Sequence, residues 1–335
     1  MASKIGVALI GLGRIGQIHA KHMIISPRIS LKWIVENELP NAEQWVSQYD
    51  LKTRCTTSDG LGRVLSDSET QAVVICTPSD THETLIQRAL HAGKSVMCEK
   101  PITTDLETTQ KCFELAESMN KPLLCAFNRR FDPSFRKVRD AVHGSCYGTL
   151  RNIRITSRDQ TPPPISYIQS SGGIFSDSTI HDLDMSTWIS GSRPVSVYAK
   201  GVAFDPEIRR CGDYDQVFVA IEYENCALSI IDNGRMAAYG YDQRLEVLCE
   251  SGMLSVENKV TNLTTEHGRD VTSVPRIDTQ FTSRYMDAYW EELQHFIDIL
   301  QGKQANLVTK DDTLTAMRLA EACKVSAKSG SRVTV

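Results

Sequence analysis

The feature that most constrains this chain is the stretch from Gly11 to Gly16, which reads G-L-G-R-I-G. A short apolar run at residues 5–9 precedes it, and a segment with helical character follows it to about residue 25. This order predicts a strand, a tight turn and a helix. Gly11 would permit the turn, Gly13 would let the backbone approach a pyrophosphate at the helix N-terminus, and Gly16 would allow close helix-to-strand packing.

A second predicted strand, at residues 31–35, leads into Glu36, which lies 20 residues beyond Gly16. A carboxylate in this position can accept hydrogen bonds from both hydroxyls of an adenosine ribose, and it would repel a 2′-phosphate. This favours NAD over NADP. The alternative stays open, because the two residues after Glu36 could share or shift the role and Arg14 could reach a phosphate.

Strand-like and helix-like segments then alternate as far as residue 127, and the strand-like ones are short apolar runs, as in parallel strands buried on both faces. The predicted strands cover residues 72–76, 95–98 and 123–127, and the predicted helices cover residues 82–92 and 105–119. Repeated βα units form a doubly wound sheet that binds ligands at the C-terminal ends of its strands. We therefore expect a dinucleotide-binding Rossmann domain over residues 1–127.

Two of these strand ends carry polar residues that could meet a cofactor. Thr77 and Pro78 follow one strand, with His82 shortly after, and Glu99 and Lys100 end the next. The proline after Lys100 stops further pairing, which would hold the ammonium at the rim of the sheet where a nicotinamide should lie. His82 could instead cap its own helix, and Lys100 could be a solvated lysine after an edge turn.

After residue 127 the pattern changes to strand-like runs separated by short turns, which suit antiparallel pairing in an open sheet. The predicted strands cover residues 149–158, 195–200, 216–223, 227–232 and 244–249, and amphipathic helices at residues 281–300 and 313–327 close the chain. We expect residues 128–335 to form a substrate-binding and oligomerisation domain of α+β type. The fold class is then α/β, with a parallel Rossmann sheet and an open, mainly antiparallel sheet.

Asp177 and His181 lie four residues apart in the stretch 172–185, which has helical character, so on a helix they would share a face. Histidine, with an ordinary pKa of about 6.5, exchanges a proton near neutral pH, and a nearby carboxylate would orient it and stabilise its charged form. The alternative interpretation is a helix start with an acidic first turn and a surface histidine. Gly172 and Gly173 could let this loop approach a cofactor ring.

The composition narrows the partners. The 335 residues are 41% hydrophobic and 23% charged, with a net charge of −4 that gives no general attraction to nucleic acid or to an anionic membrane. No apolar run approaches the roughly 20 residues that span a bilayer, and the N-terminus lacks a signal-peptide h-region. The ten cysteines are scattered, without a Cys-x-x-Cys pair. We expect a cytoplasmic protein with reduced cysteines and small-molecule partners.

We expect no metal. His19 and His22, three residues apart on the first predicted helix, are better explained as core and surface residues than as a metal pair. The acidic residues around His181 could be drawn as an oxygen-and-imidazole site, but Lys100 would then place an ammonium beside the ion.

The stretches G-L-G-R-I-G, V-I-C-T-P-S-D-T-H, C-E-K-P, F-N-R-R-F-D-P and G-G-I-F-S-D-S-T-I-H-D-L-D occur in this order along the chain. With all five at compatible spacings, the sequence closely resembles the Gfo/Idh/MocA family of oxidoreductases, and within it the members similar to myo-inositol 2-dehydrogenase. The resemblance covers essentially the whole chain. It implies a nicotinamide-dependent dehydrogenase of a polyol or sugar, whose C-terminal open sheet carries the substrate and often mediates homodimers or homotetramers.

The resemblance also implies roles for single residues. The family's catalytic lysine falls on Lys100, and its aspartate and histidine pair falls on Asp177 and His181. Substrate binding is implied for these three and for Arg130, Asp184 and Tyr241, with Tyr239 as a competitor for the last. The residues expected to bind the cofactor are Gly11, Gly13, Arg14, Ile15, Gly16, Glu36, Thr77, Pro78, His82, Glu99 and Lys100.

We therefore expect an NAD-dependent enzyme that transfers a hydride to the nicotinamide from a secondary alcohol of a myo-inositol-like cyclic polyol or a sugar. His181 would take the hydroxyl proton, Asp177 would orient the imidazole, and Lys100 would stabilise the negative charge that develops on the substrate oxygen. The alternatives are a dehydrogenase of another sugar or diol that uses NADP, and a non-catalytic dinucleotide-sensing regulator on the same fold. Substrate choice is expected to depend on loops such as residues 161–169.

Overall fold

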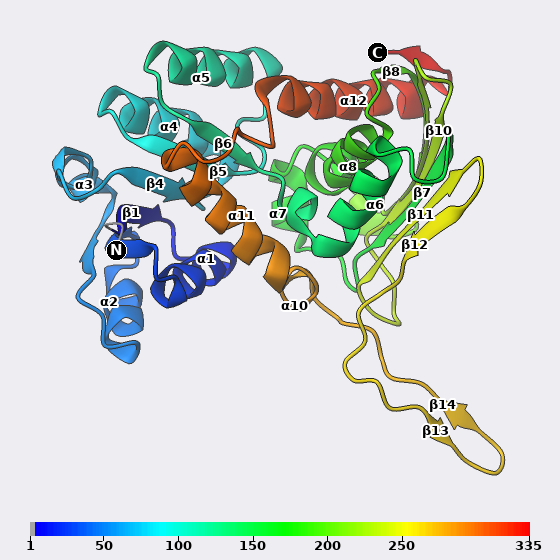
Figure 1. Cartoon of the computed structure of the whole chain (residues 1–335), viewed down its shortest axis with the longest axis horizontal. Helices are drawn as coiled ribbons and strands as arrows, with labels where there is room; N and C mark the ends of the chain where they lie inside the picture. The colour runs from blue at the N-terminus through cyan, green and yellow to red at the C-terminus, as the bar shows by residue number, and fades with distance from the viewer. Residues whose placement is uncertain (1–3) are drawn as a thin grey trace. The chain divides into compact units, whose positions relative to one another are not determined.

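A computed structural model describes residues 4–335 of the chain, which divide into two compact units (Figure 1). The first unit runs to Phe131 and resumes over Asp287–Leu314, and the second comprises Asp132–Met286 and Thr315–Val335. The segment Asp287–Leu314 thus packs with the first unit although it follows most of the second in sequence. Periodicity shows that a helix has an apolar face, but it does not show which surface that face will meet.

The first unit is built on a six-stranded parallel sheet. Its strands are β1 (Ile5–Ile10), β2 (Ile29–Val35), β3 (Arg54–Thr56), β4 (Ala72–Ile75), β5 (Ser95–Glu99) and β6 (Leu123–Ala126). Their order is β3-β2-β1-β4-β5-β6, with every pair parallel. The order reverses between β1 and β4, which makes their C-terminal ends the place where a doubly wound sheet binds a ligand. The expected Rossmann sheet is confirmed.

Helices complete this unit. They are α1 (Arg14–Ile25), α2 (Leu39–Gln48), α3 (Leu61–Ser66), α4 (His82–His91), α5 (Leu106–Ser118), α11 (Met286–Leu300) and the first turn of α12 (Lys310–Ser329). The helix expected over residues 281–300 is interrupted at Tyr285, where φ −111° and ψ 19° leave the helical region between α10 (Phe281–Arg284) and α11. None of the helices in residues 4–335 is long and apolar enough to cross a membrane.

The second unit is built on a seven-stranded open sheet. Its strands are β7 (Leu150–Arg158), β8 (Pro194–Val202), β9 (Gln216–Tyr223), β10 (Leu228–Gly234), β11 (Asp242–Cys249), β12 (Met253–Val256) and β15 (Val333–Thr334). The order is β12-β11-β7-β10-β9-β8-β15, and among these pairs β7 and β10 are parallel while the others are antiparallel. The expectation of an open, mainly antiparallel sheet is confirmed.

Alternate residues of this sheet are buried, because one face packs on helices and the other carries exposed side chains. The helices are α6 (Pro133–His143), α7 (Ile165–Ser170), the π-helical turn η4 (Phe175–Thr179), α8 (Ile180–Ser190), α9 (Pro206–Arg210), α10 and the part of α12 from Thr315 onward. Helix α8 packs against β7 and α6. A long hairpin ending in β13 (Glu266–His267) and β14 (Thr272–Ser273) extends from the sheet (Figure 1).

Candidate active site

The turn between β1 and α1 requires its glycines. Gly11 has φ +92°, and a Cβ there would lie 2.7 Å from the carbonyl oxygen of Cys76. A Cβ on Gly16 would lie 2.1 Å from the carbonyl oxygen of Gly11. Nothing among the described residues lies within 4 Å of a Cβ built on Gly13, which caps α1 without a side-chain hydrogen bond. The N-terminus of α1 thus has the open space and the backbone N–H groups that suit a pyrophosphate.

Glu36, directly after β2, lies beside this turn. Its Oε2 accepts a hydrogen bond from the backbone N–H of Leu12 at 2.7 Å, and its Oε1 accepts one from that of Glu38 at 3.3 Å. The carboxylate is therefore held next to the glycine turn, where the ribose of a dinucleotide bound to α1 would meet it. The residues of the first unit fit an adenine dinucleotide.

His82 joins the two strand ends that were expected to meet the cofactor. It is the first residue of α4 and is 1% exposed. Its Nε2 lies 2.9 Å from the carbonyl oxygen of Thr77, and its Nδ1 lies 2.8 Å from that of Pro101. The ring nitrogens thus face the loop after β4 and the loop after β5. These contacts connect His82 to the two loops that are expected to meet the cofactor. A direct contact between His82 and the cofactor stays a prediction.

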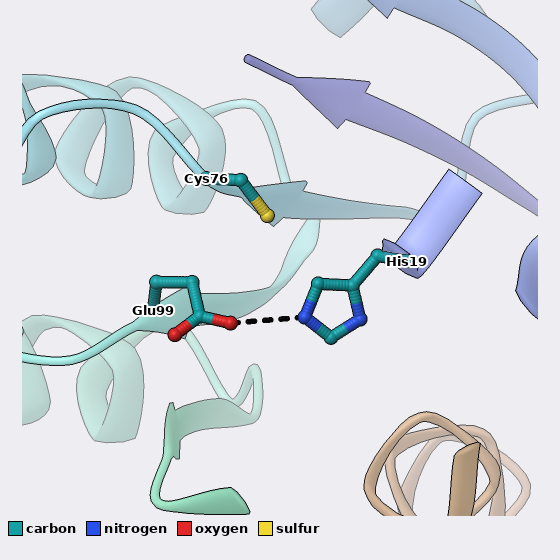
Figure 2. A group of neighbouring side chains, drawn as sticks. All are labelled: His19, Cys76 and Glu99. Atoms are coloured by element: carbon teal, nitrogen blue, oxygen red, sulfur yellow. Dashed lines mark hydrogen bonds and ion pairs between the residues drawn. The ribbon is translucent and has the colours of Figure 1, made fainter. Parts of the chain in front are cut away.

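A partly buried cluster lies at the end of β5 (Figure 2). His19 of α1 and Glu99 of β5 are joined by a hydrogen bond of 2.9 Å between Nε2 and the accepting Oε1, and Cys76 points toward them from the end of β4 (Figure 2). His22 is buried as well and stacks edge-on against Trp290, so it is not the surface residue we expected. Burial lowers the pKa of His22 to about 4, and the neighbouring charge of His19 adds to the effect.

The ligand atoms of His19, Cys76 and Glu99 all lie within 4.8 Å of one another, so the group has the composition of a metal site. Two observations favour a structural role. The imidazole and the carboxylate already bond each other, and burial raises the pKa of the Cys76 thiol well above its ordinary value, with the charges of Glu99 and Glu292 adding to the effect. A cysteine binds a metal ion as the thiolate, and the raised pKa disfavours that form. The expectation of no metal stays a prediction.

Lys100 and Arg130 lie in the first unit, in different settings. Lys100 follows β5 directly and is half-buried next to Glu99. Arg130 is 1% exposed, and its Nη1 donates to the carbonyl oxygen of Leu307 at 2.9 Å and lies 3.1 Å from Oδ2 of Asp312. Burial acts to raise the pKa of Asp312, but the charge and hydrogen bond of Arg130 outweigh it and the pKa is lowered. A substrate contact by Arg130 stays a prediction.

Asp177 and His181 lie in the second unit on one continuous helical stretch. Residues Phe175–Thr179 form the π-helical turn η4, and α8 begins at Ile180, so Asp177 lies in the wide turn and His181 in the first turn of the α-helix. Single π turns inside helices occur frequently at functional sites. Both side chains are half-buried, whereas most of α8 is buried. The helical stretch predicted from the sequence is confirmed, with this change in winding.

The glycines before η4 have left-handed backbones, with φ +81° at Gly172 and φ +85° at Gly173. A Cβ on Gly173 would lie 3.0 Å from Oδ1 of Asp213. Within the second unit, the absence of a side chain at Gly173 therefore permits a close approach to the Asp213 carboxylate. The approach of the loop to a cofactor ring stays a prediction.

Both oxygens of Asp177 have partners in the second unit. Oδ1 accepts a hydrogen bond from the hydroxyl of Tyr167 at 2.8 Å, and Oδ2 lies 3.5 Å from Nη1 of Arg235. Tyr167 belongs to α7, so residues 165–169 of the expected substrate loop are helical. The sequence motifs did not point to Arg235. A lone arginine after a strand carries no signal that distinguishes it from a solvated side chain.

The remaining substrate candidates of the second unit are buried or turned toward the protein. Asp184 is 2% exposed on α8, and the ring of Tyr241 packs edge-on against Tyr285. Tyr239 is mostly exposed, and its hydroxyl donates to Oδ2 of Asp242 at 2.6 Å and accepts from Nη1 of Arg158 at 2.8 Å. The substrate contacts expected of Asp184 and Tyr241 stay predictions, and so does the choice between the two tyrosines.

Two family models match the chain. Residues 5–127 match the model described as the oxidoreductase family with an NAD-binding Rossmann fold, and residues 135–255 match the GFO/IDH/MocA C-terminal domain. Among curated proteins, an inositol 2-dehydrogenase of Rhizobium meliloti is 37% identical over 98% of each chain. A myo-inositol 2-dehydrogenase of Thermotoga maritima is 36% identical over 96% of this chain and 95% of that protein.

Solved structures agree with these similarities. A putative myo-inositol dehydrogenase from Sinorhizobium meliloti superimposes with a TM-score of 0.95 at 36% identity, covering 99% of this chain and 100% of that one. A scyllo-inositol dehydrogenase from Lactobacillus casei, with bound NAD(H) and scyllo-inositol, superimposes with a TM-score of 0.90 at 26% identity over 99% of each chain. The likeness extends over the full length of the chain.

Proposed function

Because this chain belongs to the Gfo/Idh/MocA family of NAD-dependent oxidoreductases, we propose that it oxidises a secondary alcohol of an inositol. The similarities to known proteins already indicate that the protein is an NAD-dependent dehydrogenase that acts on CH–OH groups of a polyol. The myo-inositol substrate and the roles of single residues are the proposal. Relatives named as inositol 2-dehydrogenases at 36–37% identity support it.

The cofactor fits the residues of the first unit. The α1 N-terminus offers a pyrophosphate its N–H groups next to the open space at Gly13, and Glu36 lies beside the same turn for the ribose. We assign contacts along this path also to Arg14, Ile15, Thr77, Pro78 and Glu99. When bound, NAD accepts the hydride that leaves the alcohol carbon.

The chain itself supplies the groups that handle the proton and the charge. His181 is the base that removes the hydroxyl proton, at a nitrogen whose ordinary pKa of about 6.5 suits the task. Asp177, one turn earlier, orients the imidazole and balances its charge once it is protonated. The ammonium of Lys100 hydrogen-bonds the substrate oxygen and stabilises the negative charge that develops there. The presence of all three residues in one chain is the observation that supports the proposal.

Arg130, Asp184 and Tyr241 are proposed to shape the substrate site. Their burial suggests how two of them would act: Arg130 through the backbone segment that it holds at Leu307, and Tyr241 through its packing on Tyr285. His82 is proposed to act on the cofactor in the same indirect way, through the loops at Thr77 and Pro101.

We propose that the protein works as a homodimer or homotetramer in the cytoplasm. The outer face of the second sheet carries large apolar side chains that are about half exposed, including Phe218 at 52% and Ile230 at 48%. Large apolar side chains exposed on one face of a sheet favour a contact between protein chains. All ten cysteines are free thiols, as expected in a reducing compartment.

A substrate panel tests the function. Purified protein is offered myo-inositol, other inositol isomers and aldoses, with NAD or NADP, and formation of the reduced cofactor is followed. We expect turnover with at least one inositol and NAD. Turnover only of another sugar or diol with NADP would replace the inositol proposal. Cofactor binding without turnover of any polyol or sugar would favour a dinucleotide-sensing regulator.

Variants test the assigned groups. Lys100→Ala and His181→Ala are each expected to lower kcat by about 10² to 10⁴-fold, the range for losing a general base or a positioned charge. His267→Ala, on the exposed β13 of the second unit, is the matched control and should keep full activity. Turnover near that of the unchanged enzyme in either site variant would contradict its assignment.

A further inference from the structure

Arg235 is a buried cation that the catalytic scheme has not used. It follows β10 directly, and its side chain is 1% exposed. Nη1 lies 3.5 Å from Oδ2 of Asp177, and Nη2 lies 3.1 Å from Oδ2 of Asp213. One guanidinium thus lies between two carboxylates, both partly exposed and both in the same unit. The planar fork of arginine suits such a bridge.

Asp213, on the far side of this bridge, fixes the start of the catalytic helical stretch. Its Oδ1 accepts a hydrogen bond of 2.9 Å from the backbone N–H of Ile174, the residue before η4. The left-handed Gly173 leaves room for this contact, because a Cβ there would lie 3.0 Å from the same oxygen. Arg235 is therefore anchored to the backbone that carries Asp177 as well as to the Asp177 side chain.

Stability alone does not account for this arrangement. A buried guanidinium is costly unless its donors are satisfied, and replacing such ion pairs by apolar side chains is often neutral or stabilising. Within the described residues, Nε of Arg235 has no hydrogen-bond acceptor. The bridge to Asp177, at 3.5 Å, is also at the long limit of a hydrogen bond. A buried arginine that contributes little stability, next to a carboxylate proposed to be catalytic, therefore points to a role in the reaction.

We propose that Arg235 is a positioning residue, which acts on the reaction by fixing Oδ2 of the Asp177 carboxylate while Tyr167 holds Oδ1. With Oδ1 bonded by Tyr167 and Oδ2 facing Arg235, the carboxylate plane is set, and with it the orientation that Asp177 gives to His181. The inference rests on the proposed function, since it needs Asp177 to serve the base. It predicts that the effect of Arg235 on turnover passes through Asp177.

A double-mutant cycle tests this dependence. Arg235→Met, Asp177→Asn and the double variant are compared with the unchanged enzyme in kcat and KM for myo-inositol at saturating NAD. In the unchanged background, Arg235→Met should lower kcat by about 10- to 100-fold with a smaller change in KM, as misplacement of a catalytic group does. In the Asp177→Asn background, Arg235→Met should lower kcat by less than about threefold.

Arg284→Met is the matched control. Arg284 is also a buried arginine of the second unit, and its carboxylate partner is Asp132, at 2.5 Å, instead of Asp177. Its loss should lower the thermal midpoint, but its effect on kcat, whatever the size, should multiply with that of Asp177→Asn. Arg235→Lys, which retains a charge without the fork, should recover part of the activity.

The outcomes separate the inference from the proposed function. If Asp177→Asn retains turnover near that of the unchanged enzyme, the catalytic role of Asp177 fails, and the inference fails with it. If Asp177→Asn is impaired but Arg235→Met costs the same factor in both backgrounds, the inference alone is overturned. If Arg235→Met does not fold, Asp213→Asn replaces it in the cycle. Asp213→Asn loosens the same anchor and should show the same dependence on Asp177.

Discussion

Glu292 is a carboxylic acid in a fully buried setting. It lies on α11 with an exposed fraction of 0%, and among the described residues neither of its oxygens has a hydrogen-bond partner. Burial raises its pKa well above the ordinary value of 4.5, and the charge of Glu99 adds to the effect. Both effects favour the neutral form of the side chain in the folded protein. Amphipathic periodicity would assign a glutamate to the solvent side, so this residue was not found from the sequence.

A neutral Glu292 makes stability depend on pH. Between the ordinary pKa of 4.5 and the raised value, the folded protein holds a proton that the unfolded chain has lost, so its stability falls as pH rises. Glu292→Gln removes this dependence. We expect the thermal midpoint of the unchanged protein, relative to that of Glu292→Gln, to decrease as the pH is raised above about 5, as followed by thermal unfolding.

Glu291→Gln is the control, since Glu291 is half-buried on the same helix. The difference in thermal midpoint between Glu291→Gln and the unchanged protein should show no comparable trend with pH. A constant difference between Glu292→Gln and the unchanged protein across this range would mean that Glu292 titrates alike in the folded and unfolded states.

The glycine turn between β1 and α1 acts as one element. Gly16→Ala would place a methyl group 2.1 Å from the carbonyl oxygen of Gly11, so the helix would have to move away from the turn. We expect a loss of stability of about 1 to 3 kcal/mol, the usual cost of overpacking. Weaker NAD binding should accompany it, because the N–H groups of α1 would shift. Chemical unfolding and a fluorescence titration with NADH measure the two effects.

Gly62→Ala provides the comparison within the same unit. Gly62 lies in α3, and nothing among the described residues is within 4 Å of its Cβ position. Alanine there should be neutral or stabilising by up to about 1 kcal/mol, with unchanged NAD binding. Equal effects of the two substitutions would show that the turn tolerates a side chain.

The helical stretch that carries Asp177 and His181 shows what sequence patterns reveal about an element and what they miss. The helical character of residues 172–185 predicted a helix that carries Asp177 and His181, and η4 with α8 confirms it. The π winding was not predicted, because both windings place these residues about one turn apart and no residue type is specific to it. The break at Tyr285 between α10 and α11 was likewise not predicted, since one helix was expected there.

At the scale of the whole molecule, the outer face of the second sheet is the interface that we propose for the homodimer or homotetramer. Ile230→Asp would place a charge among its apolar side chains, and such a group is costly to bury in an interface. We expect the unchanged protein to sediment as a dimer or tetramer and Ile230→Asp to shift toward the monomer. Analytical ultracentrifugation measures both. Ile25→Asp, at an exposed apolar residue of α1, should leave the assembly unchanged. A monomeric unchanged protein would contradict the proposal.

By itself, the sequence determined the classes of structure and the residues that carry a local signature. Alternating βα units predicted the parallel sheet, the glycine spacing predicted the turn, and the motifs singled out Lys100, Asp177 and His181. These inferences succeed because a strand, a tight turn or a helix face depends on residues within a few positions of one another.

The tertiary structure alone decided which distant side chains meet. Arg235 reaches Asp177 across 58 positions of sequence, and Glu99 reaches His19 across 80. The return of α11 to the first unit, where it brings Glu292 into the core, is a third case. Such contacts depend on how sheets and helices pack, and one sequence carries no spacing signal for that packing. For this reason the motifs named the groups proposed to react, while the residues that hold them were found only in the fold.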